Sequence, residues 1–70
     1  MMQRLEVDSS SIDTVGYDEE TQILEIEFRV GVYQYEDVPE YIYHDFMNAD
    51  SKGRFFHENI KYEYFCSRVE

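Results

Sequence analysis

The stretch ILEIEFRVGVYQYEDVPE, residues 23–40, decides the fold that the sequence predicts. Apolar and charged residues alternate through its first half, which is typical of a strand with one buried and one solvated face. The buried face is expected to carry every second residue: Leu24, Ile26, Phe28 and Val30. Alternation resumes after Gly31, so the two runs predict an antiparallel hairpin. Pro39 ends the strands, because proline has no N–H to donate to a sheet.

The turn of this hairpin determines which way two tyrosines face. Tyr33 and Tyr35 are two residues apart on the second strand and therefore share a face. A two-residue turn at Val30-Gly31 would pair Phe28 with Tyr33 and direct both rings to the core. A three-residue loop would turn them to the other face, where they could stack on nucleic-acid bases. We favour the first register, because it unites the rings with the apolar stripe.

The segments that flank the hairpin complete the predicted fold. Residues 11–17 (SIDTVGY) predict a third strand, whose broken alternation indicates a bulge, and residues 18–21 (DEET) predict a polar turn. A helix is expected over about 39–49, with Asp37 as its cap and one apolar stripe formed by Val38, Ile42, Phe46 and Ala49. By the same geometry at least one of Tyr41 and Tyr43 is expected to be partly exposed.

A second helix is expected to begin near Lys52, capped by Asp50 or Ser51. Residues 62–69 follow it as a short strand or an extended arm. We therefore predict one α+β domain over residues 1–70: a three-stranded antiparallel β-meander, two helices packed on one face, and an extended C-terminal tail.

The composition limits where and how such a chain can work. Seventy residues allow one small domain, so the five Phe and seven Tyr are needed largely for the core. The single cysteine, Cys66, excludes an internal disulfide and is expected to be a packed thiol. No signal peptide or membrane-spanning run is found in the sequence, and we expect a soluble cytoplasmic protein.

The charge is strongly acidic and unevenly distributed. The net charge is −10, yet residues 1–50 alone carry two basic and thirteen acidic side chains, whereas residues 51–70 carry four basic and three acidic ones. Nucleic-acid-binding proteins usually have the opposite balance, because Lys and Arg neutralise phosphates. The acidic part would instead steer the protein towards a basic partner.

The only basic concentration predicts an anion site at the start of the second helix. Free N–H groups and the positive end of the helix dipole can hold an anion there. The side chains and backbone that would contribute are Ser51, Lys52, Gly53 and Arg54, with Lys61 and Arg68 as extensions. An ordinary helix cap with solvated cations explains the same residues.

The sequence offers little support for catalysis. His44 and His57 lack ligands at metal-binding spacing and are expected at the surface. The Ser9-Ser10-Ser11 run suits a turn or cap better than a nucleophile. We therefore expect no enzyme activity, no metal and no cofactor.

Four motifs in order, VDSSSIDTVGYD, LEIEF, YQYEDVP and ADSKGRFFHENI, make the chain resemble the KTSC domain family from about Val7 to Tyr62. Members of that family occur alone in bacteria or at the C-terminus of some lysyl-tRNA synthetases. Their central Tyr-x-Tyr falls on Tyr33 and Tyr35, and the synthetase association implies RNA as a ligand. We thus expect a non-catalytic binding module for RNA or phosphate. The alternative is an acidic interaction domain that recognises a basic protein.

Overall fold

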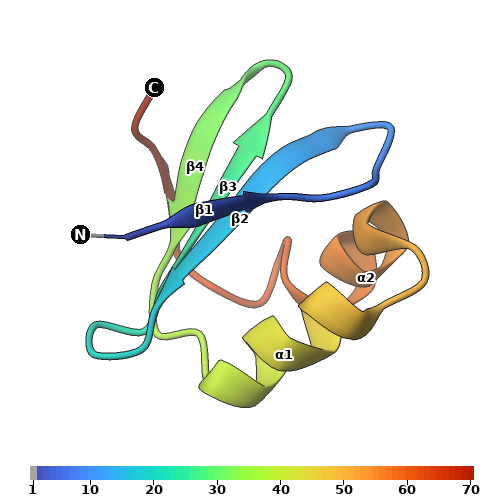
Figure 1. Cartoon of the computed structure of the whole chain (residues 1–70). Helices are drawn as coiled ribbons and strands as arrows, with labels where there is room; N and C mark the ends of the chain where they lie inside the picture. Colours follow the sequence, from blue (N-terminus) through green and yellow to red (C-terminus); the bar gives the residue numbers. More distant parts are fainter. Residues whose placement is uncertain (1) are drawn as a thin grey trace.

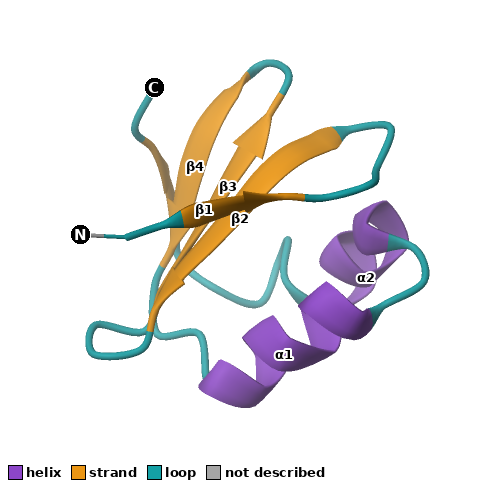
Figure 2. Ribbon diagram, viewed as in Figure 1, coloured by secondary structure: helices purple, strands orange, loops and turns teal. Residues whose placement is uncertain are grey.

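The computed structural model describes residues 2–70 and contains one antiparallel sheet whose five strands lie in chain order (Figure 1). The strands are β1 (Arg4–Glu6), β2 (Ile12–Asp18), β3 (Ile23–Phe28), β4 (Gly31–Tyr35) and β5 (Cys66–Arg68). Two helices, α1 (Glu40–Asn48) and α2 (Lys52–Asn59), connect β4 to β5 and lie on one side of the sheet (Figure 2). The predicted α+β class with two helices is confirmed.

The predicted number of three strands was wrong, because a short strand lies at each edge of the central meander. β1 pairs with β2, and its Arg4 Nε lies 3.3 Å from Glu25 Oε2 on β3. Every residue of β1 is exposed, so no apolar alternation marks it in the sequence. At the other edge the C-terminal segment forms β5, antiparallel to β4, which selects the strand from the two options left open for this tail.

The β3–β4 hairpin turns at Arg29 and Val30, one position earlier than expected. Phe28 consequently pairs with Gly31 and not with Tyr33. This moves the pairing by two residues, and because the side-chain period of a strand is also two, every side chain keeps the expected face.

The two tyrosines of β4 therefore face the core, as predicted. Tyr35 is 4% exposed and its ring meets the Phe56 ring edge-on, with centroids 5.6 Å apart. Tyr33 is partly buried and contacts Phe28 in the same way at 5.7 Å. Val30 was expected in the apolar stripe, but it occupies the turn and is 73% exposed.

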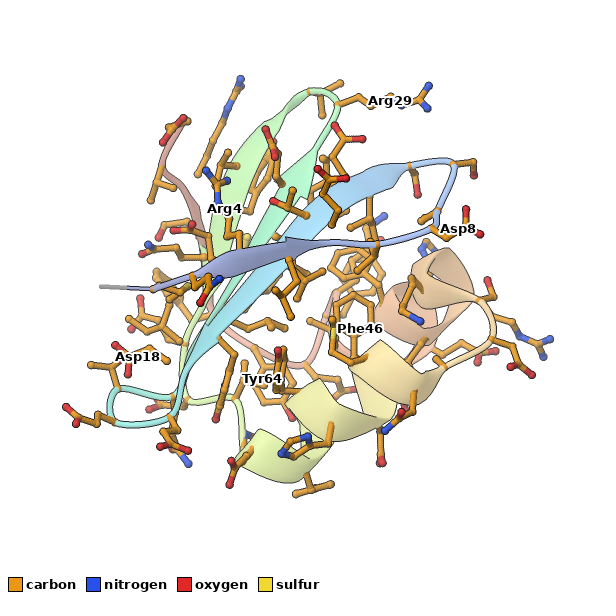
Figure 3. The ribbon with its side chains drawn as sticks, in the orientation of Figure 1. Arg4, Asp8, Asp18, Arg29, Phe46 and Tyr64 are labelled. Carbon is orange, nitrogen blue, oxygen red and sulfur yellow. The ribbon has the colours of Figure 1, made fainter. Side chains whose placement is uncertain are left out.

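The core lies between the sheet and the two helices. Phe46 of α1 is fully buried there (Figure 3), together with Leu24 and Ile26 from β3 and Ile60 just after α2. β2 contributes Ile12, and the pairing of β2 with β3 shifts just after this residue, as the broken alternation predicted.

The first helix begins differently from the prediction. Pro39 occupies the N-cap position of α1 without any side-chain cap. Asp37, the expected cap, has a φ of 57° in the preceding loop. The reason lies in the next residue: Val38 is fully buried and its N–H donates to Gln22 O at 2.9 Å, so the chain is tied to the β2–β3 loop before the helix starts.

The predictions for the Ser9–Ser11 run and for Cys66 have different outcomes. Ser9 Oγ accepts N–H bonds from Ser11 and Ile12 at 3.4 and 3.3 Å, which is the predicted turn role. Cys66 was expected to be a packed thiol, but it is exposed. It lies on the three-residue edge strand β5, all of whose residues are exposed.

Candidate functional site

At the predicted anion site, the start of α2 is capped by a side chain, and its lysine donates a hydrogen bond to a backbone carbonyl of the preceding loop. Ser51 is the N-cap, and its Oγ accepts a hydrogen bond from Arg54 N–H at 3.2 Å. Lys52 Nζ donates to Ala49 O at 2.7 Å. Gly53 lies beside the β1–β2 loop, since a Cβ at this position would be 3.5 Å from Ser11 Oγ. The helix start is thus formed as expected, and anion binding there stays a prediction.

Of the other basic residues of that prediction, Arg54 lies in this helix start, but Lys61 and Arg68 do not. Arg54 Nε lies 3.4 Å from Glu58 Oε2. Lys61 follows the end of α2, and its Nζ lies 5.3 Å from the centroid of the Tyr62 ring. Arg68 donates to Val30 O at 2.9 Å and thereby lies against the β3–β4 turn. The structure therefore brings Ser51, Lys52, Gly53 and Arg54 together, but places Lys61 and Arg68 elsewhere.

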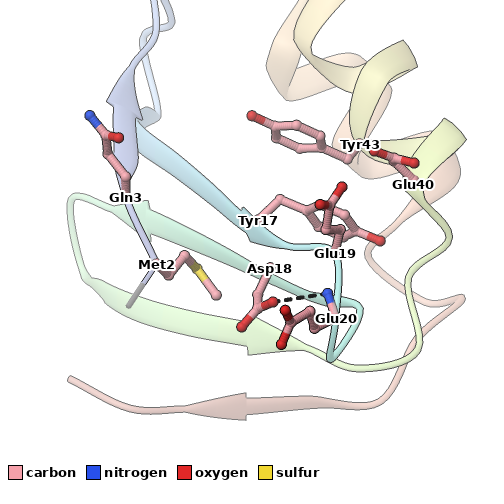
Figure 4. Close-up of a pocket in the computed structure, with 8 residues that line it drawn as sticks. All are labelled: Met2, Gln3, Tyr17, Asp18, Glu19, Glu20, Glu40 and Tyr43. Atoms are coloured by element: carbon pink, nitrogen blue, oxygen red, sulfur yellow. Dashed lines mark hydrogen bonds between the residues drawn. The ribbon is translucent and has the colours of Figure 1, made fainter.

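A different part of the surface has the form of a binding site. It is an open cavity of about 490 Å³ where the N-terminal segment, the β2–β3 loop and the first turn of α1 meet (Figure 4). Its lining residues are Met2, Gln3, Tyr17, Asp18, Glu19, Glu20, Glu40 and Tyr43. Among residues 2–70, four carboxylates and no basic side chain line this site, which we call the acidic cavity.

Two stacked tyrosines form the aromatic wall of the acidic cavity. The rings of Tyr17 on β2 and Tyr43 on α1 have centroids 4.8 Å apart and planes inclined by 10°. Tyr17 hydroxyl donates to Val38 O at 2.5 Å, which fixes its ring against the start of α1. Tyr43 is partly buried while Tyr41 is 65% exposed, so the expectation that at least one of them is partly exposed is confirmed.

The carboxylates of the acidic cavity change the pKa of one tyrosine in this wall. Burial first, and then the charges of Glu40, Glu19 and Asp18, raise the pKa of Tyr17 above its ordinary value. Asp18 Oδ1 accepts the N–H of Glu20 at 3.0 Å, which shapes the loop. Glu40 Oε2 lies 3.5 Å from His44 Nε2 at the surface. Such an arrangement favours a cation and repels phosphate.

Sequence reasoning did not identify the acidic cavity. It recognised residues 18–21 as a polar turn and the N-terminal fifty residues as an acidic part that would attract a basic partner. The signal was therefore present as charge, but the partners Tyr17 and Tyr43 are twenty-six positions apart in the chain. Only the packing of α1 against β2 joins them.

A metal site and a membrane-spanning helix find no support in the described residues. In residues 2–70 no three His, Cys, Asp or Glu side chains lie together in a way that could hold a metal ion. Neither of the helices in this range is long and apolar enough to span a membrane. Burial, followed by its hydrogen bond with the Cys66 thiol, raises the pKa of Tyr35 above its ordinary value.

Comparison with known proteins agrees with the motifs. A family model described as the KTSC domain matches residues 8–64. The crystal structure of a KTSC domain protein from Yersinia pestis superposes over the full length of both chains, with a TM-score of 0.98 and 48% sequence identity. A protein of Stutzerimonas stutzeri is 43% identical over 91% of this chain and 92% of its own length. A lysine–tRNA ligase of Nostoc punctiforme is 43% identical over 81% of this chain, which corresponds to 10% of the ligase.

Proposed function

The chain belongs to the KTSC domain family, and from that premise we propose that it is a non-catalytic binding module whose acidic cavity receives a basic segment of a partner protein. The single observation that carries this proposal is the composition of the acidic cavity. Carboxylates from two separate segments, residues 18–20 and Glu40, line the same open cavity as a stacked tyrosine pair, and no lysine or arginine of residues 2–70 lines it. A basic segment would satisfy this charge, and the acidic surface would speed its approach.

We propose that the protein works in the cytoplasm and catalyses no reaction. The lone thiol of Cys66 is free and exposed, which suits a reducing compartment. To bind the cations of a partner, carboxylates need only be charged and correctly positioned. A small rigid domain is sufficient for this role.

RNA binding is the second candidate, and the lysine–tRNA ligase relative is the observation that favours it. If RNA binds, its phosphates would lie at the start of α2, on Ser51, Lys52 and Arg54. Two features weaken this candidate. Lys52 is bonded to Ala49 O and Arg54 is paired with Glu58, so each cation would have to leave an existing partner. The net charge of −10 would repel the rest of the RNA backbone.

A binding experiment with matched charge variants separates the two candidates. The probes are a fluorescent basic nonapeptide and a single-stranded RNA dodecamer, each titrated with the full chain in 50 and 200 mM salt. We expect the peptide to bind and the triple variant Glu19→Gln, Glu20→Gln, Glu40→Gln to weaken binding by about tenfold or more. The control removes three exposed carboxylates elsewhere: Glu6→Gln, Asp8→Asn and Asp45→Asn. This control variant has the same net charge as the cavity variant. It should nevertheless bind the peptide as tightly as the native chain does.

Two outcomes would contradict the proposal. Peptide affinity that falls equally in both triple variants would mean that only net charge matters and that the acidic cavity is no site. RNA binding that is abolished by Lys52→Glu with Arg54→Glu, with no peptide binding, would establish the second candidate instead. Circular dichroism of each variant verifies that the fold is kept.

A further inference from the structure

We infer that the group recognised in the acidic cavity is the guanidinium of an arginine side chain, in preference to the ammonium of lysine. This inference rests on the proposed function and specifies the chemistry of the partner. It depends on the shape of the aromatic wall as well as on the charge around it.

The aromatic wall is flat and rigid. The Tyr17 and Tyr43 rings are parallel to within 10°, and each covers one face of the other. The hydrogen bond from Tyr17 hydroxyl to Val38 O prevents the first ring from turning. A planar, weakly hydrated guanidinium can stack on such a surface, whereas a compact ammonium keeps its water more strongly.

Carboxylates lie around the wall where the edge of a stacked guanidinium would reach. Glu19 and Glu40 line the same cavity as the Tyr17 ring (Figure 4). After burial, their negative charges contribute to the raised pKa of Tyr17. Glu19 and Glu20 form no ion pair with any of residues 2–70, so their oxygens are available to a ligand. A guanidinium presents five N–H donors in one plane and can stack on a ring while donating to carboxylates at its rim.

The remaining lining suits the stem of such a side chain. Met2, an adaptable apolar side chain, lines this open cavity from the N-terminal segment. Long cationic side chains lay their methylene groups along apolar surface and keep the charged end at polar groups. At about 490 Å³ the cavity lies within the size range of small-ligand sites.

The test compares two peptides that differ only in the cation. The probes are the acetylated and amidated nonapeptides GRSGRSGRS and GKSGKSGKS, titrated calorimetrically into the full chain in 150 mM salt. Both cations are attracted to an aromatic face, but only the planar guanidinium also stacks flat on it, so we expect about fivefold tighter binding of the arginine peptide. The variant Tyr43→Leu should reduce this ratio to about one while changing the affinity for the lysine peptide less than twofold.

Matched variants keep the test decisive. Tyr43→Phe retains a ring and should retain the preference for arginine. Tyr41→Leu removes a tyrosine from the exposed side of the same helix and should change neither affinity. Equal affinity of the native chain for the two peptides would overturn the inference and leave the proposed function standing. Loss of both affinities in Tyr43→Leu, with the fold intact, would also overturn it. Failure of both peptides to bind the native chain would reject the proposed function itself.

Discussion

The start of α2 and the acidic cavity both contain several charged residues, but they differ in how those charges are used. At α2, Lys52 is bonded to the backbone of Ala49 and Arg54 is paired with Glu58 one helical turn away. In the acidic cavity, Glu19 and Glu20 lie on a loop and find no ion-pair partner within residues 2–70. The cations of α2 are therefore engaged within their own segment, whereas the carboxylates of Glu19 and Glu20 remain available to a ligand.

The same contrast applies to the aromatic residues. Tyr33 and Tyr35 lie two residues apart on one strand, and their rings pack in the core against Phe28 and Phe56 respectively. Tyr17 and Tyr43 come from a strand and a helix and meet at the rim of the core, where a cavity opens beside them. A site therefore arises where separate elements meet, and not where the sequence is richest in one residue type.

The largest expected effect comes from a residue on which both regions depend. The Phe46 ring is fully buried and stacks on Phe55 of α2 at a centroid distance of 5.7 Å, while its helix also carries Tyr43. Phe46→Ala should lower the free energy of unfolding by about 3–5 kcal/mol, a large part of the stability of a small domain. Urea denaturation measures the loss.

The control for that variant is Phe65→Ala. Phe65 is 71% exposed, so its removal should change stability by less than about 0.5 kcal/mol. Comparable losses for the two variants would mean that the described core does not hold the helices.

A smaller loss of stability is expected from substitutions at the start of α2. Comparing stability with peptide affinity there distinguishes a structural role from a binding role. Ser51→Ala removes the acceptor for Arg54 N–H and should cost about 1 kcal/mol, because a helix donor loses its cap. Arg54→Ala breaks only an exposed ion pair and should cost about 0.2–0.5 kcal/mol. Thermal unfolding compares them, and neither should alter peptide affinity. A tenfold loss of affinity in Ser51→Ala would move the site to α2.

The smallest effect concerns the tyrosine wall at alkaline pH. The unfolded chain releases the Tyr17 proton near pH 10, whereas burial and nearby carboxylates keep the folded pKa higher. The unfolded state therefore binds fewer protons above pH 10, and the free energy of unfolding falls as the pH rises. Below that pH both states hold the proton and this contribution to the pH dependence vanishes.

Tyr17→Phe should make this alkaline decline shallower without removing it, because the pKa values of Tyr35 and Tyr64 are also raised. Urea titrations at pH 8, 10 and 11 provide the comparison. Tyr62→Phe, at an exposed position, is the control and should leave the slope as it is. An unchanged slope in Tyr17→Phe would show that its ring is not held as described.

Much of the fold could be predicted from the sequence because its signals are local. The alternation of Leu24, Ile26 and Phe28 predicts a strand and its buried face, and Ser51 marks the start of a helix. The edge strand β1 was not predicted, and the tail that forms β5 was predicted only as a short strand or an extended arm, because the residues of both strands are exposed and give no clear period. The turn of the β3–β4 hairpin was misplaced by one residue because the glycine that marks it, Gly31, begins β4 and does not form the turn.

In contrast to the fold, most of the candidate site could not be predicted from the sequence. The sequence alone determined that the chain is acidic and predicted a strand-rich α+β domain, and it favoured a core position for Tyr33 and Tyr35 without deciding it. Tertiary structure decided that Tyr17 and Tyr43 stack and that the carboxylates of the β2–β3 loop and α1 share one cavity. The physical reason is that periodicity and capping act over a few residues, whereas this cavity depends on how α1 packs across the end of β2.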